Sequence, residues 1–331
     1  MRALQGRTLI AGVLGAALAL ATAACGGGGG TSGAGSATTT PAAATTAAKV
    51  LDIGYIADFN GSSTVAIATE RGMWAKHGLD ARPKVFTNGP LQVQALNAGD
   101  LDAGYLGPGA LWLPASGQAR IVAVNSIGLA DRVIAQPGLI SIADLEGKTV
   151  GVPEGTSGDM ILRLALAKAG MSIDDVTVVA MDPTTVVTAF SSRQIDAAGI
   201  WYPLIDTIKQ RVPDLVELAS SEDFYPQTAF PTVFVVSNDV AERDPELVRR
   251  LQAVIAEAND YRAAHLDEAV ATTAAFDKAP ADSFASEATK IRWLTSTELA
   301  KANSDGTVTK WLDSINRQFV SMGKLKSAPD P

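Results

Sequence analysis

Short apolar runs rich in β-branched residues alternate with longer helical patterns from residue 50 onward. Gly, Asn, Asp and Ser bound the short runs, which is typical of strands. Strands are expected at residues 50–56, 103–106, 121–124, 149–152, 177–181, 197–200 and 233–236. Helices are expected at residues 64–77, 159–169 and 245–265. This alternation predicts an α/β fold.

The sequence also resembles itself when it is shifted by 94 positions. The matched pairs are residues 60–63 with 154–157, Asn88 with Asp182, and residues 95–103 with 189–197. Because the last pair matches without a gap, we interpret the repeat as two α/β lobes built on one plan. Coincidental similarity of two generic strand–helix–strand units is the alternative.

The N-terminal residues differ in composition from the rest. Two arginines precede an uncharged apolar run at residues 9–24, and Cys25 follows. That run is shorter than the roughly 20 residues that span a bilayer, so the pattern predicts a signal peptide over residues 1–24. It is similar to a bacterial lipoprotein signal, which implies lipidation of Cys25, although Thr22 stands where that signal usually has Leu. Ordinary cleavage that leaves Cys25 free is the alternative.

Residues 25–48 consist largely of Gly, Ser, Thr, Ala and Pro. Such a composition cannot bury enough apolar surface to fold by itself. We therefore expect a flexible linker, anchored by lipid at its first residue, between the membrane and the folded lobes.

Charge and residue counts exclude several function classes. The chain has 331 residues, with 27 Lys and Arg against 35 Asp and Glu, a formal net charge of −8. This acidic balance argues against binding nucleic acid or an anionic membrane surface. One cysteine and two histidines cannot form an internal disulfide or a Cys/His zinc cage. Since the sequence also has no dinucleotide fingerprint, Walker loop or nucleophile elbow, we expect no metal and no cofactor.

Polar turns follow the expected strands of both lobes. In open α/β sheets, ligands bind where strands end and helices begin, and helix N-termini there offer N–H groups to anions. The turns at residues 60–63, 88–90, 107–109, 154–157 and 182–184 are therefore expected to open onto one cleft. The candidate ligand-binding residues are Asn60, Ser62, Ser63, Asn88, Gly107, Pro108, Thr156, Ser157, Trp201 and Tyr202. For the serines and threonine, ordinary helix capping is the alternative.

Several runs resemble solute-binding proteins of ABC importers, in particular binders of nitrate, taurine, aliphatic sulfonates and thiamine precursors. The runs are GYI at 54–56, ERGMWAKHGL at 70–79, AGDLDA at 98–103, SIADLEGKTVGVP at 141–153, IDAAGIWYP at 195–203 and SND at 237–239. The resemblance implies a bilobal periplasmic-binding-protein type II fold with crossover strands near Ile134 and Phe234. Lobe 1 would comprise residues 49–135 and 234–331, and lobe 2 residues 136–233.

The resemblance also implies the role of an extracytoplasmic lipoprotein of an ABC importer, which closes its lobes on a solute and delivers it to the permease and its ATPase. The protein would be a monomer, held at the cell membrane by its lipid anchor alone, and not an enzyme. Alternatives are a pyrimidine- or thiamine-precursor-binding protein or enzyme on the same fold, and a ligand sensor for a receptor kinase.

The expected ligand is a small organic anion, such as an aliphatic or aryl sulfonate or a taurine- or nitrate-like molecule. No Arg or Lys lies in the turns, so neutral donors would hold it. Acidic residues lie in or near the same turns, namely Asp58, Glu154, Asp159, Asp182 and Asp206. If any of them lines the cleft, the ligand carries an amine or another cation.

Overall fold

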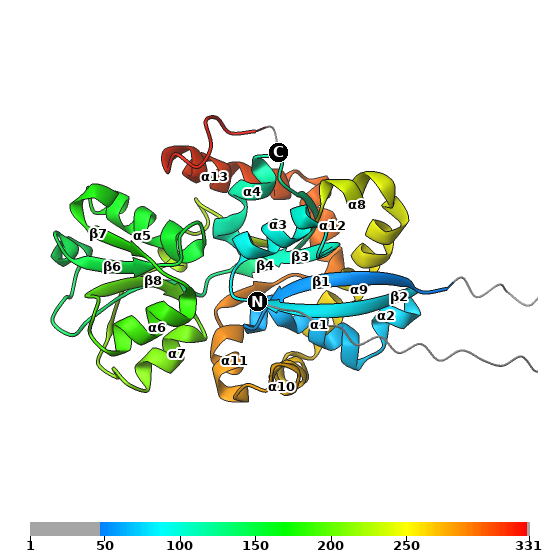
Figure 1. Cartoon of the computed structure of the whole chain (residues 1–331), viewed down its shortest axis with the longest axis horizontal. Helices are drawn as coiled ribbons and strands as arrows, with labels where there is room; N and C mark the ends of the chain where they lie inside the picture. The colour runs from blue at the N-terminus through cyan, green and yellow to red at the C-terminus, as the bar shows by residue number, and fades with distance from the viewer. Residues whose placement is uncertain (1–46, 330–331) are drawn as a thin grey trace, which may run out of the picture. The chain divides into compact units, whose positions relative to one another are not determined.

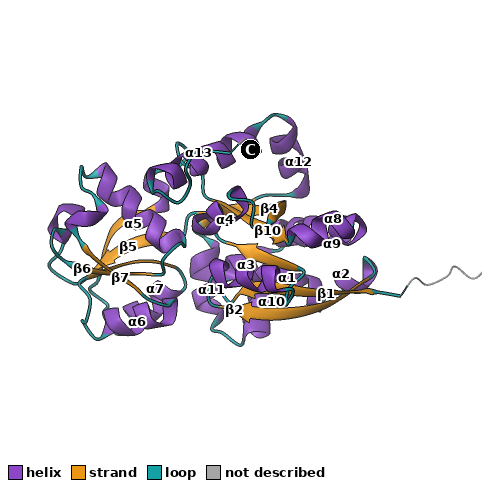
Figure 2. Ribbon diagram, turned by 45° about the horizontal axis from the view of Figure 1, so that its top comes forward, coloured by secondary structure: helices purple, strands orange, loops and turns teal. Residues whose placement is uncertain are grey.

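The computed structural model describes residues 47–329. The predicted signal peptide, the predicted lipidation site Cys25 and nearly all of the predicted linker lie outside the described residues. Within the described range, two β-sheets are surrounded by helices (Figure 1 and Figure 2).

The strands include all seven that the sequence predicts. They are β1 Lys49–Ile56, β2 Leu79–Phe86, β3 Ala103–Leu106, β4 Arg120–Gly128, β5 Asp131–Ala135, β6 Thr149–Val152, β7 Thr177–Ala180, β8 Ala197–Trp201, β9 Val216–Ser220, β10 Pro231–Val236 and β11 Ile291–Trp293. The strands β2, β9 and β11 were not predicted, because polar residues interrupt the apolar pattern of each, and β5 was expected only through the resemblance, as the crossover strand near Ile134.

The helices frame both sheets. They are α1 Phe59–Glu70, α2 Met73–Lys76, α3 Gly89–Ala98, α4 Trp112–Ala115, α5 Ser157–Lys168, α6 Pro183–Ser191, α7 Leu204–Lys209, α8 Asn238–Arg243, α9 Pro245–Ala264, α10 Leu266–Asp277, α11 Ala281–Ala288, α12 Ser296–Ser304 and α13 Thr307–Ser321. The helix expected at 245–265 is confirmed as α9, and the one expected at 159–169 is confirmed as α5.

The two sheets share one strand plan. The first has the order β11-β4-β10-β3-β1-β2 and the second the order β7-β6-β8-β5-β9. In each, three parallel strands (β2-β1-β3 and β7-β6-β8) are followed by an antiparallel strand, β10 or β5. Without β11, the two orders correspond strand for strand, as the predicted duplication requires.

The chain crosses twice between the two sheets. After β4 in the first sheet, the chain passes directly into β5 of the second, and after β9 it returns as β10 to the first. Ile134 and Phe234, the expected crossover positions, lie in β5 and β10. The predicted boundary between lobe 1 and lobe 2, at 135/136, falls after β5. In the structure β5 already pairs with β8 of the second sheet, so the chain leaves the first sheet at residues 129–130.

The repeat holds more closely in its second half than in its first. The helices α3 and α6 follow N-caps Asn88 and Asp182, which are separated by the predicted 94 positions. Strands β3 and β8 begin at the matched residues Ala103 and Ala197. The first helices differ, because α1 begins at Phe59 whereas α5 begins four residues later in the shifted register.

The helix predicted at 64–77 is two helices with an earlier start. The Asp58 side chain accepts the backbone N–H of Gly61 at 2.6 Å and so caps α1 ahead of Phe59. The helix ends at Glu70, and Gly72, at φ 65°, separates it from α2. This earlier start decides which side chains of α1 face the cleft.

Apolar cores lie on both faces of each sheet. On the first sheet, α1, α9, α10 and α11 pack against one face, as the core residues Leu51, Val254 and Phe284 illustrate. The other face is covered by α3, α4 and α13. That second core also contains Met160 and Leu164 of α5, so α5 of the second sheet shares this core with α4 and α13.

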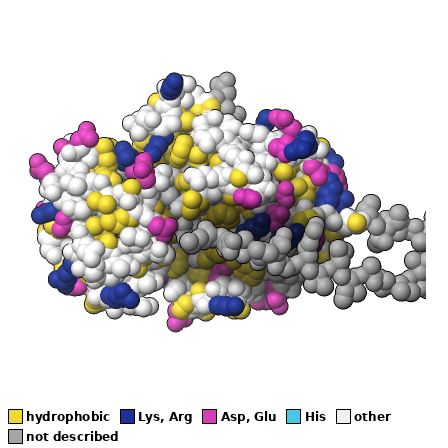
Figure 3. Space-filling model, in the orientation of Figure 1, with side chains coloured by type: hydrophobic (Ala, Val, Ile, Leu, Met, Phe, Trp, Pro, Cys, Tyr) yellow, Lys and Arg dark blue, Asp and Glu magenta, His cyan; other side chains and the backbone are white. Residues whose placement is uncertain are grey.

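The surface carries both signs of charge. Figure 3 shows acidic and basic side chains interspersed on the visible face, with no broad basic area there. Among the described helices, none is long and apolar enough to cross a membrane.

Candidate ligand-binding site

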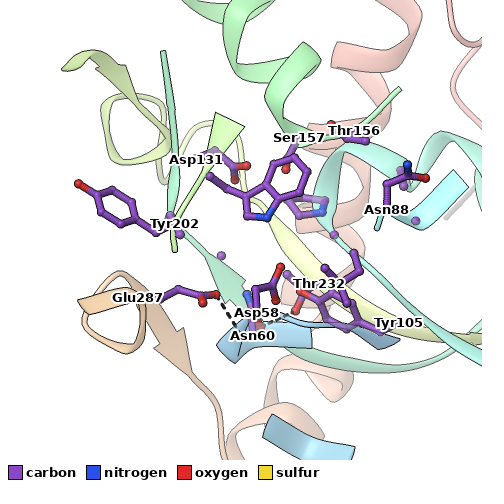
Figure 4. A pocket seen from close by; sticks show the side chains of 18 residues that line it. Asp58, Asn60, Asn88, Tyr105, Asp131, Thr156, Ser157, Tyr202, Thr232 and Glu287 are labelled. Carbon is purple, nitrogen blue, oxygen red and sulfur yellow. Dashed lines mark hydrogen bonds between the residues drawn. The ribbon is translucent and has the colours of Figure 1, made fainter. Parts of the chain in front are cut away.

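A small pocket lies between the two sheets, and its free volume is about 50 Å³. Residues from both sheets and from α11 line it, as Figure 4 shows. The lining residues are Ile56, Asp58, Asn60, Asn88, Gly89, Tyr105, Gly107, Pro108, Ala110, Gly128, Ala130, Asp131, Thr156, Ser157, Trp201, Tyr202, Thr232 and Glu287. The space admits only a compact group while the two sheets stay in this arrangement.

Most of the predicted site residues come together here. Those in the lining are Asn60, Asn88, Gly107, Pro108, Thr156, Ser157, Trp201 and Tyr202. Contact of each with a ligand stays a prediction. The other two, Ser62 and Ser63, do not line the pocket, and the early start of α1 explains why.

Both serines lie inside α1 and are fully buried. The hydroxyl of Ser62 donates to the Asp58 carbonyl oxygen at 2.6 Å. The hydroxyl of Ser63 accepts from Arg262 Nη1 of α9 at 2.7 Å. Arg262 is itself fully buried, and its guanidinium lies over the Trp293 ring at 4.1 Å. These serines therefore serve the packing of α1 on the helices behind it.

Hydrogen bonds from strands β4 and β10 hold the side chain of Asn60 in place. Its Oδ1 accepts from Asn125 Nδ2 at 3.0 Å, from Ser126 Oγ at 2.8 Å and from Thr232 Oγ1 at 3.4 Å. Three donors on one oxygen turn the Nδ2 group away from them, toward Gly128. A Cβ at Gly128 would stand 3.2 Å from that Nδ2. The amide of Asn60 therefore offers its N–H₂ donor at the pocket wall.

Close backbone packing between α5 and β8 positions the residues of the second sheet that line the pocket. A Cβ at Gly158 of α5 would lie 2.3 Å from the Gly199 carbonyl oxygen of β8, so only glycine fits here. This contact brings the first turn of α5 against β8, the strand that ends at Trp201. Thr156 caps the helix, and its hydroxyl donates to Pro153 O at 2.7 Å.

The two sides touch each other beside the pocket. A Cβ at Gly109 would lie 2.1 Å from the backbone N of Ser157, so the segment after β3 rests directly on the start of α5. Side chains add further hydrogen bonds across the cleft. Trp112 Nε1 donates to Gly155 O at 3.2 Å, Thr87 Oγ1 to Asp182 Oδ2 at 2.9 Å, and Lys324 Nζ to Glu154 Oε1 at 3.2 Å. These contacts describe a closed cleft.

Two carboxylates occupy the N-terminus of α1. Asp58 caps the helix through Gly61, as described above. Glu287 of α11 accepts the backbone N–H of Phe59 at 2.6 Å and that of Asn60 at 3.1 Å. Both acids are buried, and burial raises the pKa of Asp58 to about 7 and that of Glu287 well above its usual range.

Asp131, at the start of β5, is the third carboxylate of the lining, and it is 4% exposed. Burial raises its pKa to about 6, although Ser157, Arg132 and Ser221 each pull that pKa down. Arg132 itself turns away from the pocket, toward Glu217 and the Leu129 carbonyl. No Arg or Lys is among the described residues that line the pocket.

The two aromatic residues at the end of β8 differ in what they offer. Trp201 lines the pocket and is 8% exposed, so its ring can cover a bound molecule. The Tyr202 hydroxyl donates to Glu217 Oε1 at 2.5 Å and accepts from Lys209 Nζ at 2.5 Å. Figure 4 shows this hydroxyl pointing away from the other labelled side chains. Only the ring of Tyr202 is therefore available to a ligand.

Sequence reasoning did not place several of these residues in the site. Asp131, Thr232 and Glu287 belong to segments without a turn motif: two lie on the crossover strands and the third on α11. Asp58 and Tyr105 stood near the expected turns, but the sequence could not separate a capping or core role from a place in the lining. No group of three or more candidate metal ligands occurs among the described residues.

Two similar α/β sheets that exchange strands and enclose a small pocket have the architecture of periplasmic solute-binding proteins. Comparison with known families agrees, since residues 60–269 match the family described as NMT1/THI5 like. The chain belongs to this family.

Individual relatives are binding proteins by name. A binding protein of Brucella abortus (strain 2308) is 60% identical over 279 residues, which cover 84% of this chain and 88% of the relative. The taurine-binding periplasmic protein of Escherichia coli (strain K12) is 30% identical over 169 residues, covering 50% of this chain and 52% of that protein.

The fold also matches solved structures. The alkanesulfonate-binding protein SsuA from Xanthomonas axonopodis pv. citri, bound to MOPS, superposes with a TM-score of 0.64 at 20% identity. The match covers 86% of this chain and 97% of that one. At this identity the likeness establishes the fold alone.

Proposed function

We propose that this protein is the extracytoplasmic solute-binding receptor of an ABC importer, which captures a small molecule by closing its two lobes. The observation that carries the proposal is the pocket itself, which is lined from both sheets and bordered by direct contact between Gly109 and the start of α5. A ligand there touches both lobes, so its binding favours the closed state. The partners in this role are the ABC permease and its ATPase.

The lobes of this proposal follow the strand pairing. The crossings at residues 129–130 and 224–230 divide the chain into a lobe with residues 49–128 and 231–329 and a lobe between the crossings. Both crossings run beside the pocket, and Ala130 lines it. Bending at these two segments would open the cleft without breaking either sheet.

Attachment at the membrane through lipidated Cys25 belongs to the same proposal. The Gly-, Ser- and Thr-rich residues after it give the receptor reach toward a permease. Cys25→Ser should release the protein from the membrane fraction into the soluble fraction, with ligand binding unchanged. Retention of the variant at the membrane would contradict the lipid anchor.

The test of function is capture of a ligand together with closure of the lobes. The mature chain is incubated with extract metabolites, washed, and analysed by native mass spectrometry, and X-ray scattering follows its radius of gyration. We expect one small molecule per chain and a more compact form on binding. A chain that captures nothing and never changes its compactness would refute the receptor role.

The enzyme alternative cannot rest on a histidine. Both histidines lie outside the lining: His77 Nε2 is 2.8 Å from Glu257 Oε2, and the His265 ring stacks on Tyr261 at 4.6 Å. An enzyme on this fold would have to use a carboxylate of the lining as its general base, and turnover of the captured ligand would be its sign. The sensor alternative shares the pocket and differs only in the partner that recognises the closed form.

A further inference from the structure

The site for an anion at the start of α1 is already filled. Glu287 accepts the N–H groups of Phe59 and Asn60, and Asp58 accepts that of Gly61. These are the donors that a helix N-terminus would otherwise present to a bound oxyanion. An anion placed here would find its donors occupied and two carboxylates in its way.

Across the pocket, the buried carboxylate of Asp131 can accept further hydrogen bonds. Its Oδ1 has no hydrogen-bond partner in the part of the chain that the structure describes, whereas Oδ2 receives a long bond of 3.4 Å from Ser221 Oγ. The residue is 4% exposed and lines the pocket, with its carboxylate near the Ser157 hydroxyl, which lowers its pKa (Figure 4). A buried carboxylate oxygen without a partner is costly, which calls for a further donor.

We propose that the pocket takes a small organic cation, a protonated amine or an amidinium, whose N–H groups donate to Asp58 and Asp131. This inference rests on the proposed role as a solute-binding receptor and specifies its substrate class. It replaces the anion that the sequence suggested. The ligand brings the positive charge that the lining lacks, and it joins a carboxylate of each lobe, which couples binding to closure.

Neighbouring groups strengthen this preference. The ionisable groups that face Asp58 and Asp131 from surrounding elements are Tyr105 on β3, Arg132 on β5, Asp277 on α10 and Glu287 on α11. Only Arg132 among them is a cation, and it is already paired with Glu217 at 3.0 Å. Burial is the main cause of the raised pKa values of Asp58 and Asp131, and the charges of Asp277 and Asp131 add to it for Asp58. A bound cation would favour the ionised form of both carboxyl groups.

The remaining lining suits an organic cation. The hydroxyl oxygens of Thr156 and Ser157 and the amide oxygen of Asn88 can accept N–H groups at the rim. The Trp201 ring beside them can cover a flat, positively charged group. A protonated nitrogen on a compact or planar body therefore fits both the polar and the aromatic parts of the pocket.

Pairs of probes with the same shape and opposite charge test the proposal. The mature protein is titrated with acetamidinium and acetate, and with benzamidinium and benzoate, at pH 7.5 and constant ionic strength. We expect each cation to bind about tenfold or more tightly than its anionic partner, seen by calorimetry or a rise in melting temperature. Equal binding, tighter binding of the anions, or no response to either cation would overturn the proposal.

Charge-neutral variants locate the effect. Asp131→Asn and Asp58→Asn should each weaken cation binding by about tenfold. Asn is as good an N-cap as Asp, so α1 should survive the second change. Asp214→Asn, on an exposed loop outside the lining, is the matched control and should leave binding unchanged. Urea unfolding of each variant establishes that the fold is intact, and undiminished binding by both pocket variants would contradict the assignment.

Proton release gives an independent measure. Cation binding stabilises the ionised carboxylates, so at pH 6.5 it should release protons, which calorimetry detects by comparing buffers with different ionisation heats. Proton uptake on binding would point to an anion held by neutral carboxylic acids. If native mass spectrometry captures an anionic metabolite and the lobes close, the cation proposal fails while the receptor role stands. If nothing is captured and the lobes stay open, the receptor role itself fails.

Discussion

Asp58 and Asp131 are buried in the native chain, and their pKa values lie above those of exposed aspartates, at about 7 and about 6. Their burial costs stability whenever they are ionised. Nothing in the fold requires three carboxylates at one cavity, since one acid at the N-terminus of α1 would suffice for capping. Such a concentration of unfavourable charge is typical of functional sites.

The ligand-free protein should therefore lose stability as the pH rises. Because the folded-state pKa of each aspartate exceeds its unfolded value, the folded chain holds protons that the unfolded chain has lost. The free energy of unfolding should fall between about pH 4 and pH 7, by up to roughly 1.4 kcal/mol for each unit of pKa shift. Urea unfolding at pH 5 and pH 8 measures this. Asp131→Asn should flatten part of the decline, whereas an unchanged profile would mean that Asp131 is not buried as an acid.

Trp201 offers a prediction about binding alone. If its ring covers the ligand, Trp201→Ala should weaken binding by roughly tenfold or more. Titration with the captured ligand or with benzamidinium measures the dissociation constant, and Trp311→Ala on α13, outside the lining, serves as a control. An unchanged constant in a folded variant would assign Trp201 to the core of the second lobe.

At the scale of single elements, the sequence predicted helices and strands well where the local signals are strong. The helices expected at 159–169 and 245–265 are α5 and α9, and the repeat paired Asn88 with Asp182, which are the N-caps of α3 and α6. The start of α1 was misplaced, because Asp58 acts as its cap and the Ser-rich segment only looks like one. That error alone put Ser62 and Ser63 into the expected site. Asp131 and Glu287 could not be found from local patterns, because only the exchange of strands and the packing of α11 bring them to the cavity.

The helix α13 joins parts of both sheets, and Phe319 is its most deeply buried aromatic residue at 1% exposed. Phe319→Ala should lower the free energy of unfolding by about 3–5 kcal/mol, since it leaves a cavity among apolar neighbours. Chemical denaturation measures the loss. Val85→Ala on the exposed strand β2 should change stability by less than about 0.5 kcal/mol. A loss of similar size in both variants would mean that α13 is not docked as described.

At the scale of the whole molecule, two sheets with one plan and exchanged strands leave a cleft between them. The crossings at residues 129–130 and 224–230 are the chain connections between the sheets within the described range. Asp58 and Asp131 belong to opposite walls, so in the proposed receptor a cation would meet both carboxylates only when the walls meet. We therefore expect recognition and closure to be one event.

A substitution at Gly109 tests the coupling between ligand binding and lobe closure without changing a charged residue. In the closed arrangement a Cβ at this position would lie 2.1 Å from the backbone N of Ser157, closer than real contacts allow. Gly109→Ala should therefore hold the lobes apart, while each sheet keeps its core. We expect the affinity for a ligand to fall about tenfold or more, and the compaction seen by X-ray scattering to be lost. Gln118→Ala, at a half-buried position of the same lobe outside the lining, should bind and close normally. If Gly109→Ala closes as fully as the unmodified chain, the contact between Gly109 and α5 does not limit closure, and the ligand must hold the lobes together at another point.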